Sequence, residues 1–216
     1  MLLKVSMQLA GCGLYIITDG PRPDLLDVVA QALAGGARLL QYRDKSGDSM
    51  RRHAEAAALK QLCHVHAVPL IINDDVALAH AVGADGVHLG RNDDDIHAAR
   101  AVLGYHAIIG VSCYDSLARA ETASRGGANY IAFGAFFPSP TKPLAPTASI
   151  DLLRQSAALG TPRVAIGGIT PDNGGSLIEA GADFLAVISS VFAATDVCAA
   201  AQRLARLYPP HTGTPA

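Results

Sequence analysis

The sequence has little charge and few aromatic residues: 17% of its 216 residues are charged, 5% are aromatic and none is tryptophan. Half of the residues are hydrophobic, which is too many for a disordered chain. The formal net charge of −2 hides no long basic run, and this argues against nucleic acid or an acidic membrane surface as a partner. No apolar stretch reaches the roughly 18 to 20 residues that a membrane span needs. We expect one globular domain.

Cysteine is also scarce, and its spacing excludes the usual metal and disulfide motifs. Cys12, Cys63, Cys113 and Cys198 lie far apart and form no CxxC pair. The segment Leu9-Ala-Gly-Cys12 resembles a lipoprotein cleavage box, but the apolar region before it is short and contains Gln8. A predicted strand follows it at once. We therefore expect reduced thiols in a cytoplasmic protein.

What the sequence does contain is a repeat, in which a helical stretch rich in alanine is followed by a Gly-Ala pair and a short apolar run. The pairs stand at residues 36–37, 83–84, 127–128 and 181–182. The glycine suits a left-handed helix end, and the apolar run suits a strand that is buried on both faces. With the strands between these units, we expect eight strands, at residues 13–19, 38–43, 69–73, 86–90, 107–112, 130–134, 163–168 and 184–189.

A helix-like segment follows each predicted strand, with apolar residues three and four positions apart, as in residues 24–35 and 172–180. Eight alternating units in a chain of this length predict an α/β fold, the single-domain (β/α)8 TIM barrel. The alternative is an open doubly wound sheet, which the missing Gly-x-Gly-x-x-Gly after the first strand weakens. We place an N-terminal extension at residues 1–12, the barrel at 13–208 and a flexible tail at 209–216.

Polar residues gather where the predicted strands end, which is where such barrels carry their chemistry. The second strand ends in Gln41-Tyr-Arg-Asp-Lys45. Gln41 and Arg43 are two positions apart and face the same side, and Lys45 continues that line. Two cations at the barrel mouth predict phosphate binding. The alternative is that Arg43 and Lys45 only form ion pairs with Asp44 or Asp48.

Acidic residues follow the third and fourth strands, in Asn73-Asp-Asp75 and Asn92-Asp-Asp-Asp95. Carboxylates after two neighbouring strands predict a Mg²⁺ site, because Mg²⁺ prefers one or two carboxylates together with water and substrate phosphate. Each aspartate would also suit a helix start, where the helix dipole favours negative charge. His88, in the fourth strand, is either a general base or a structural histidine held by hydrogen bonds.

The last two strands are followed by Gly167-Gly168 and by Ser189-Ser190. This pattern predicts a phosphate cup made of backbone amides. The alternative is an ordinary tight turn, with Pro171 starting a helix. Ser112, after the fifth strand, lacks the Ser/His/Asp partners of a nucleophile.

Six motifs, in order, resemble the thiamine phosphate synthase family over roughly residues 13 to 205. They are Gln41-Tyr-Arg-Asp-Lys45, Asn73-Asp-Asp75, His88-Leu-Gly90 with Asp93, Gly110-Val-Ser112, Pro138-Ser-Pro-Thr-Lys142 and Ile166-Gly-Gly-Ile-Thr170. The resemblance implies a Mg²⁺-dependent transferase. Such an enzyme joins 4-amino-2-methyl-5-pyrimidinylmethyl diphosphate to 4-methyl-5-(2-phosphoethyl)thiazole and releases pyrophosphate by a dissociative substitution.

The resemblance also implies roles for individual residues. The pyrimidine diphosphate would be bound by Gln41, Tyr42, Arg43, Asp44, Lys45, Asn73, Ser112 and Lys142. The thiazole phosphate would be bound by Ser139, Pro140, Thr141, Gly168, Ile188 and Ser189. Asp74 and Asp93 would hold Mg²⁺, and Arg43, Lys45 and Lys142 would be catalytic. Ser139 stands where the family often has threonine, and it keeps the hydroxyl.

Three other functions compete with this one. A thiazole tautomerase-like barrel needs no metal-diphosphate site. A Schiff-base aldolase needs a desolvated lysine inside the barrel, whereas Lys142 lies past Pro140 in a loop. A non-catalytic sensor of phosphorylated ligands would bind both molecules and release no pyrophosphate. In each case the expected partners are small phosphorylated molecules, with no nucleic acid and no membrane, and a homo-oligomer is possible.

Overall fold

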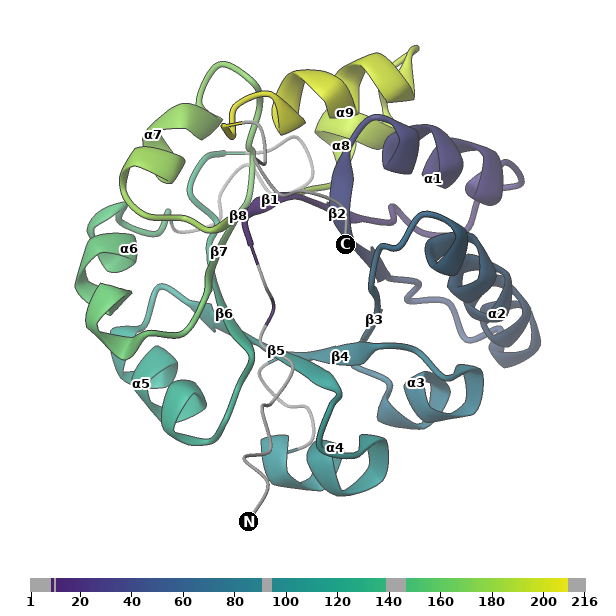
Figure 1. Ribbon diagram of the computed structural model, residues 1–216, viewed down its shortest axis with the longest axis horizontal. Helices are drawn as coiled ribbons and strands as arrows, with labels where there is room; N and C mark the ends of the chain where they lie inside the picture. The colour runs from purple at the N-terminus through teal and green to yellow at the C-terminus, as the bar shows by residue number, and fades with distance from the viewer. Residues whose placement is uncertain (1–8, 10, 91–94, 139–146, 210–216) are drawn as a thin grey trace.

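Eight parallel strands form a closed barrel in the computed structural model, which describes residues 9, 11–90, 95–138 and 147–209. Each strand pairs with the next along the chain, and the last pairs with the first (Figure 1). The predicted (β/α)8 barrel is confirmed, and the open-sheet alternative is wrong. The strands are β1 (Gly13–Ile17), β2 (Ala37–Tyr42), β3 (Leu70–Asn73), β4 (Gly86–Leu89), β5 (Ile108–Tyr114), β6 (Tyr130–Phe133), β7 (Arg163–Ile166) and β8 (Phe184–Val187).

Helices surround the strands on the outside of the barrel (Figure 1). They are α1 (Leu25–Ala34), α2 (Ser49–Val65), α3 (Val76–Val82), α4 (Ile96–Leu103), α5 (Leu117–Arg125), α6 (Asp151–Gln155), the short 3-10 helix η1 (Ser156–Leu159), α7 (Gly174–Glu179), α8 (Ser189–Phe192) and α9 (Val197–Ala205). Helices α1 and α7 correspond to the predicted helices at 24–35 and 172–180. No helix in the described ranges is long and apolar enough to span a bilayer.

The four Gly-Ala pairs end helices as predicted. Gly36, Gly83, Gly127 and Gly181 all have positive φ angles, of 99°, 62°, 86° and 103°. A side chain would strain the backbone there, so glycine allows the chain to leave a helix and enter the next strand within a few residues. These turns therefore stay short.

Strand residues alternate between two apolar layers. One set, including Tyr15, Leu39 and Phe184, packs together in the barrel interior. The alternate set, including Ile16, Leu40 and Tyr42, packs in the cluster shared with the helices. Leu9, placed in the N-terminal extension from sequence, belongs to the interior cluster. This alternation decides which polar side chains face the inside of the barrel at its mouth.

Candidate active site

The strand register brings the predicted site residues to one end of the barrel. Gln41 pairs with Ile17, Asn73 pairs with His88, and Ser112 pairs with Ala132, each near the carboxyl end of its strand. Ile188 and Ser189 directly follow β8, and Ile188 packs against the interior cluster. Five predicted site residues lie outside the described residues: Asp93, Ser139, Pro140, Thr141 and Lys142.

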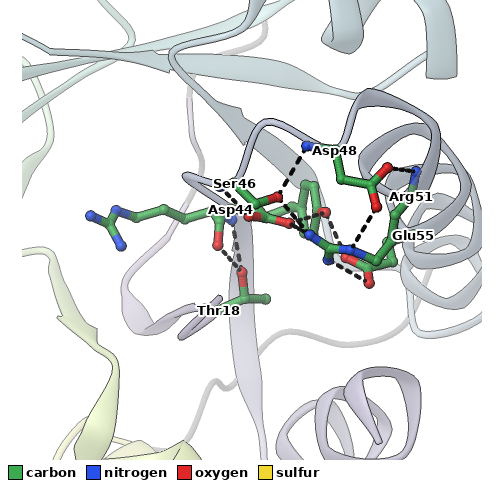
Figure 2. Close-up of polar contacts among 8 residues, drawn as sticks. Thr18, Asp44, Ser46, Asp48, Arg51 and Glu55 are labelled. Carbon is green, nitrogen blue, oxygen red and sulfur yellow. Dashed lines mark hydrogen bonds and ion pairs between the residues drawn. The ribbon is translucent and has the colours of Figure 1, made fainter. Parts of the chain in front are cut away.

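The loop after β2 is tied to α2 by a buried ion pair (Figure 2). The Asp44 side chain is 0% exposed and lies 2.7 Å from the Arg51 guanidinium. It also accepts a hydrogen bond from the Ser46 amide, at 2.7 Å. Burial alone would raise the pKa of Asp44, but the hydrogen bonds from Ser46 and Arg51 outweigh it and lower that pKa. Arg51 also binds Glu55, at 2.9 Å, and so anchors the loop to the helix.

The same loop is tied to β1 on its other side. Thr18 Oγ1 accepts a hydrogen bond from the Arg43 amide, at 2.7 Å, and donates one to the Arg43 carbonyl, at 3.0 Å. The Tyr42 hydroxyl donates to Glu55 in α2, at 2.6 Å. The Tyr42 and Asp44 side chains thus hold the loop against α2 and stand apart from the barrel interior. Their contact with substrate remains a prediction.

Arg43 does not form an ion pair with Asp44 or Asp48, which was the alternative to phosphate binding. Asp44 and Asp48 instead lie 2.7 Å and 3.6 Å from Arg51. The Arg43 guanidinium makes no hydrogen bond or ion pair with any residue in the described part of the chain. Lys45 pairs with Asp74, which follows the neighbouring strand β3. At least one cation is therefore available to an incoming anion.

Two consecutive aspartates after β3 have different roles. Asp75 caps α3 by accepting from the Leu78 amide, at 2.8 Å, and it also binds Arg52. Asp74 has a φ of 62°, a left-handed conformation that is uncommon for a residue with a side chain. Its carboxylate accepts from Asn73 Nδ2, at 2.6 Å, and pairs with Lys45. The start of α3 thus accounts for an aspartate at position 75, but it does not account for one at position 74.

Asp95 resembles Asp75, because it caps α4 by accepting from the His97 amide, at 2.9 Å. A cavity of about 430 Å³ at the mouth is lined in part by Lys45, Asn73 and Asp74. Within the described ranges no group of three His, Cys, Asp or Glu side chains is placed to hold a metal. Asp74 is nevertheless a half-buried carboxylate in a site of oxygen donors, which suits Mg²⁺.

A chain of hydrogen bonds crosses the barrel interior. Gln41 Nε2 lies 2.5 Å from the Tyr15 hydroxyl, which lies 2.8 Å from the Tyr130 hydroxyl. Tyr130 in turn lies 3.0 Å from His88 Nδ1, and His88 Nε2 lies 2.8 Å from Ser112 Oγ. Burial lowers the pKa of His88 to about 4, so the ring is neutral near pH 7. Both ring nitrogens of His88 are engaged, which supports the structural histidine of the two alternatives.

Tyr15 and Tyr130 are not among the predicted site residues, because they stand in apolar strands whose pattern is typical of core residues. A signal was present in the alternation, since Tyr15 and Gln41 both fall on inward-facing positions. A phenol hydroxyl buried inside a barrel needs a hydrogen-bond partner.

A second loop pair lies at the ends of β7 and β8. Gly167 and Gly168 have φ angles of 105° and 62°. A Cβ at Gly168 would lie 2.5 Å from the Pro138 carbonyl oxygen, so the loops after β6 and β7 touch through backbone. The Ser190 hydroxyl donates to the Ile169 carbonyl, which joins the loops after β7 and β8.

The backbone of these loops offers amide donors. In α8 the first hydrogen bonds come from Val191 and Phe192, which both donate to the Ile188 carbonyl, at 3.1 Å and 3.0 Å. The amides of Ser189 and Ser190 precede these donors at the helix start. Helix α7 begins at Gly174, three residues after Pro171, so the proposed helix start at Pro171 is wrong. This arrangement fits the predicted phosphate cup.

A model of the thiamine monophosphate synthase family matches residues 14–191, which is most of the chain. The chain belongs to this family. Thiamine-phosphate synthase of Chromobacterium violaceum is 55% identical over 195 residues, covering 89% of this chain and 94% of the relative. Thiamine-phosphate synthase of Azoarcus sp. is 59% identical over 187 residues, covering 85% of this chain and 91% of the relative.

Solved structures agree with the family assignment. The thiamine phosphate pyrophosphorylase from Pyrococcus furiosus superposes with a TM-score of 0.81 at 34% identity, covering 91% of this chain and 95% of that one. A 3-hexulose-6-phosphate synthase superposes with a TM-score of 0.69 at 17% identity, covering 91% of this chain and 100% of that one, and this likeness shows the fold alone. The structure at 34% identity thus supports the family, whereas the one at 17% identity supports only the barrel fold.

Proposed function

We propose that this chain joins 4-amino-2-methyl-5-pyrimidinylmethyl diphosphate to 4-methyl-5-(2-phosphoethyl)thiazole, giving thiamine phosphate and pyrophosphate. Relatives named thiamine-phosphate synthase match at 55% and 59% identity over most of both chains. The structural observation that supports the proposal is that two groups of residues suited to anions lie at one end of the barrel. Arg43, Lys45 and Asp74 suit a metal-bound diphosphate, and the Gly168 and Ser189 loops suit a second phosphate.

The reaction needs no protein nucleophile. The bond between the methylene carbon and the diphosphate oxygen breaks, pyrophosphate keeps the electron pair, and the electron-rich aminopyrimidine stabilises the methylene cation. The thiazole nitrogen then forms the new bond to that carbon. The protein's task is to stabilise the departing charge and to keep water from trapping the cation. Ser112 Oγ lies 2.8 Å from His88 Nε2, but His88 Nδ1 bonds the Tyr130 hydroxyl and not a carboxylate, so these residues form no Ser/His/Asp triad.

Arg43 and Lys45 would act on the leaving group. A cation about 4 Å from a phosphate oxygen contributes on the order of 4 kcal/mol at an effective dielectric constant near 20. Lys142, outside the described residues, would add a third positive charge. Holding both substrates in a reactive arrangement could contribute roughly 7 to 11 kcal/mol more at best.

We also propose a Mg²⁺ requirement. Asp74 and Asp93 would hold the ion, although Asp93 lies outside the described residues. Bound Mg²⁺ would supply charge neutralisation on the diphosphate oxygens. The left-handed backbone of Asp74 supports this role, because strained conformations of residues with side chains cluster at functional sites.

The competing functions have less support. Relatives at this level of identity are named synthases, which does not favour a tautomerase or a sensor. A Schiff-base aldolase needs a desolvated lysine, but the two lysines of the described chain, Lys45 and Lys60, are both ion-paired and partly exposed.

A pyrophosphate-release assay with the purified protein tests the proposal. We expect release only when both substrates and Mg²⁺ are present, and none after a chelator is added. Tight binding of both substrates without pyrophosphate release would indicate a sensor. Activity that survives complete removal of divalent metal would contradict the metal proposal and leave the synthase proposal intact.

A further inference from the structure

The hydrogen-bonded chain from Gln41 to Ser112 joins two residues that the proposed function assigns to the pyrimidine diphosphate. Its three middle members, Tyr15, Tyr130 and His88, come from β1, β6 and β4. The hydroxyls of Tyr15 and Tyr130 and both ring nitrogens of His88 are already bonded within the chain, so none of these groups is left to bind a ligand. Whatever these three residues do for the reaction, they do through Gln41 and Ser112.

Packing fixes the rings of this chain. Tyr15 and Tyr130 meet edge to face, with ring centroids 5.9 Å apart and an interplanar angle of 89°. His88 stacks on Tyr130 at 5.6 Å and 20°. Gly110 makes room for the Tyr130 ring, because a Cβ at Gly110 would lie 1.9 Å from Tyr130 Cζ. The rings therefore occupy one arrangement.

The hydrogen bonds in the chain must all run in the same direction. Each phenol has a single proton, and His88 Nδ1 accepts a hydrogen bond only when it carries no proton of its own. If Gln41 Nε2 donates to Tyr15, then Tyr15 donates to Tyr130, and Tyr130 donates to His88 Nδ1. His88 then carries its proton on Nε2 and donates to Ser112 Oγ.

Reversing the middle of this chain would leave a buried donor unsatisfied. If Tyr130 donated to Tyr15, the Tyr15 proton would have no acceptor among the described residues, since Gln41 already donates to the same oxygen. A buried hydroxyl proton without a partner is unfavourable. With Gln41 Nε2 facing Tyr15, the direction from Gln41 to Ser112 is the one that satisfies every member.

The two ends of the chain then have opposite polarity. Gln41 uses its amide nitrogen on Tyr15, so its Oε1, which bonds no residue in the described ranges, remains an acceptor. Ser112 Oγ accepts the hydrogen bond from the His88 Nε2–H group, so the Ser112 hydroxyl proton remains available as a donor.

We propose that Tyr15, Tyr130 and His88 are positioning residues, which fix Gln41 as a hydrogen-bond acceptor and Ser112 as a hydrogen-bond donor for the pyrimidine diphosphate. This inference rests on the proposed function. The substrate offers the matching groups: its exocyclic amine donates, and its ring nitrogens and diphosphate oxygens accept. As the methylene cation forms, the amine loses electron density to the ring and its N–H becomes a stronger donor. The bond to Gln41 Oε1 therefore strengthens in the transition state, which raises kcat.

A first experiment needs no substrate. In protein labelled with ¹⁵N-histidine, the His88 signals are assigned by comparison with His88→Gln. We expect a neutral ring protonated at Nε2 at pH 7. In Tyr130→Phe, which keeps the ring and removes both the donor to Nδ1 and the acceptor for Tyr15, we expect this tautomer preference to weaken. Protonation at Nδ1 in the wild type would overturn the proposed direction.

A second experiment measures turnover. Tyr15→Phe keeps the ring and frees the Gln41 amide, so we expect kcat to fall about tenfold, as for the loss of one neutral hydrogen bond. The KM for the thiazole phosphate should stay unchanged. Tyr208→Phe is the matched control, since Tyr208 is a buried tyrosine at the opposite end of the barrel and its hydroxyl is not part of the chain. It should leave kcat unchanged.

A double-mutant cycle separates positioning from general stability. In a Gln41→Leu background, Tyr15→Phe should have no further effect on kcat, because Tyr15 acts through Gln41. An equal tenfold fall in both backgrounds, or an unchanged kcat in folded Tyr15→Phe, would overturn the proposal. If the wild type releases no pyrophosphate, the proposed function fails, and the histidine spectrum still decides the direction of the chain.

Discussion

At the scale of single residues, the site depends on how neighbouring residues of the same type are divided between structure and function. Asp74 and Asp75 are adjacent and chemically identical. Asp75 satisfies the first turn of α3, whereas Asp74 has a left-handed backbone and a carboxylate directed to Lys45. A difference in backbone conformation thus separates a helix cap from a candidate metal ligand.

This division predicts opposite effects for two substitutions. Asp74→Asn keeps a residue that tolerates positive φ and removes the charge, so we expect Mg²⁺-dependent turnover to be lost while the thermal unfolding midpoint changes little. Asp75→Ala removes the helix cap and should cost about 1 kcal/mol of stability, with the Mg²⁺ dependence of turnover retained. Metal titrations of the rate and thermal unfolding measure both. Full metal-dependent activity in Asp74→Asn would exclude Asp74 as a ligand.

At the scale of elements, the loops after the strands are held by contacts to helices that the substrate does not touch. The loop after β2 is fixed by Arg51 of α2, which binds the buried carboxylate of Asp44 (Figure 2). That ion pair leaves the Arg43 side chain unengaged by the described residues. The Arg51–Asp44 ion pair thus both fixes the loop and leaves Arg43 available to a ligand.

The Asp44 contacts predict a stability change in acid. The folded-state pKa of Asp44 lies below its ordinary value, because the Ser46 and Arg51 hydrogen bonds outweigh burial. Its contribution is therefore fully present above the unfolded-state pKa, about 3.9, and is lost as the pH falls through the lower folded-state pKa. Unfolding free energies measured from about pH 6 to pH 3 should fall less steeply in Asp44→Asn than in the wild type. Parallel curves would show that Asp44 carries no such linkage.

The loops after β7 and β8 predict a selective effect on the second substrate. Gly168→Ala places a Cβ 2.5 Å from the Pro138 carbonyl oxygen at a φ of 62°, so the cup must shift and the KM for the thiazole phosphate should rise. Gly160→Ala is the control, because its φ is 66° and its Cβ would meet nothing within 4 Å. Both variants should lose about 1 kcal/mol from the left-handed backbone. A KM that rises equally in both would contradict a cup at Gly168.

The order of elements was predictable because its signals are local. A Gly-Ala pair ends a helix within a few residues, and an apolar run marks a buried strand, so all eight strands were found. The division between Asp74 and Asp75 was not predictable, because both suit a helix start. The partner of Asp44 was also missed: Arg51 lies in the first turn of α2, whereas Arg43 is the neighbour of Asp44 in the sequence. The roles of Asp93 and of residues 139 to 142 remain predictions.

At the scale of the whole molecule, barrel closure makes contacts that no local pattern contains. Tyr15 and Tyr130 are 115 positions apart, and their hydroxyls lie 2.8 Å from each other. They meet because β1 and β6 face one another across a closed interior. The same interior that stabilises the barrel thus carries a polar chain to its mouth.

Packing inside the barrel predicts that a methyl group added at Gly110 lowers the stability. Gly110→Ala would place a Cβ 1.9 Å from Tyr130 Cζ, an overpacking that should cost roughly 1 to 3 kcal/mol. Gly175→Ala, in α7, meets nothing within 4 Å, and it should stabilise the protein by up to about 1 kcal/mol, because alanine loses less backbone entropy in a helix.

Denaturant unfolding of the wild type, Gly110→Ala, Tyr130→Ala and the double variant tells whether the Tyr130 ring causes the loss of stability. If the Tyr130 ring is the obstacle, Gly110→Ala should cost clearly less in a Tyr130→Ala background than in the wild type, since the ring and the new methyl group compete for one space. Additive losses would mean that Gly110 is required for backbone reasons instead. Because the same ring passes the hydrogen bond to His88, Gly110→Ala should also weaken the His88 tautomer preference, which links closure of the barrel to the polarity of its site.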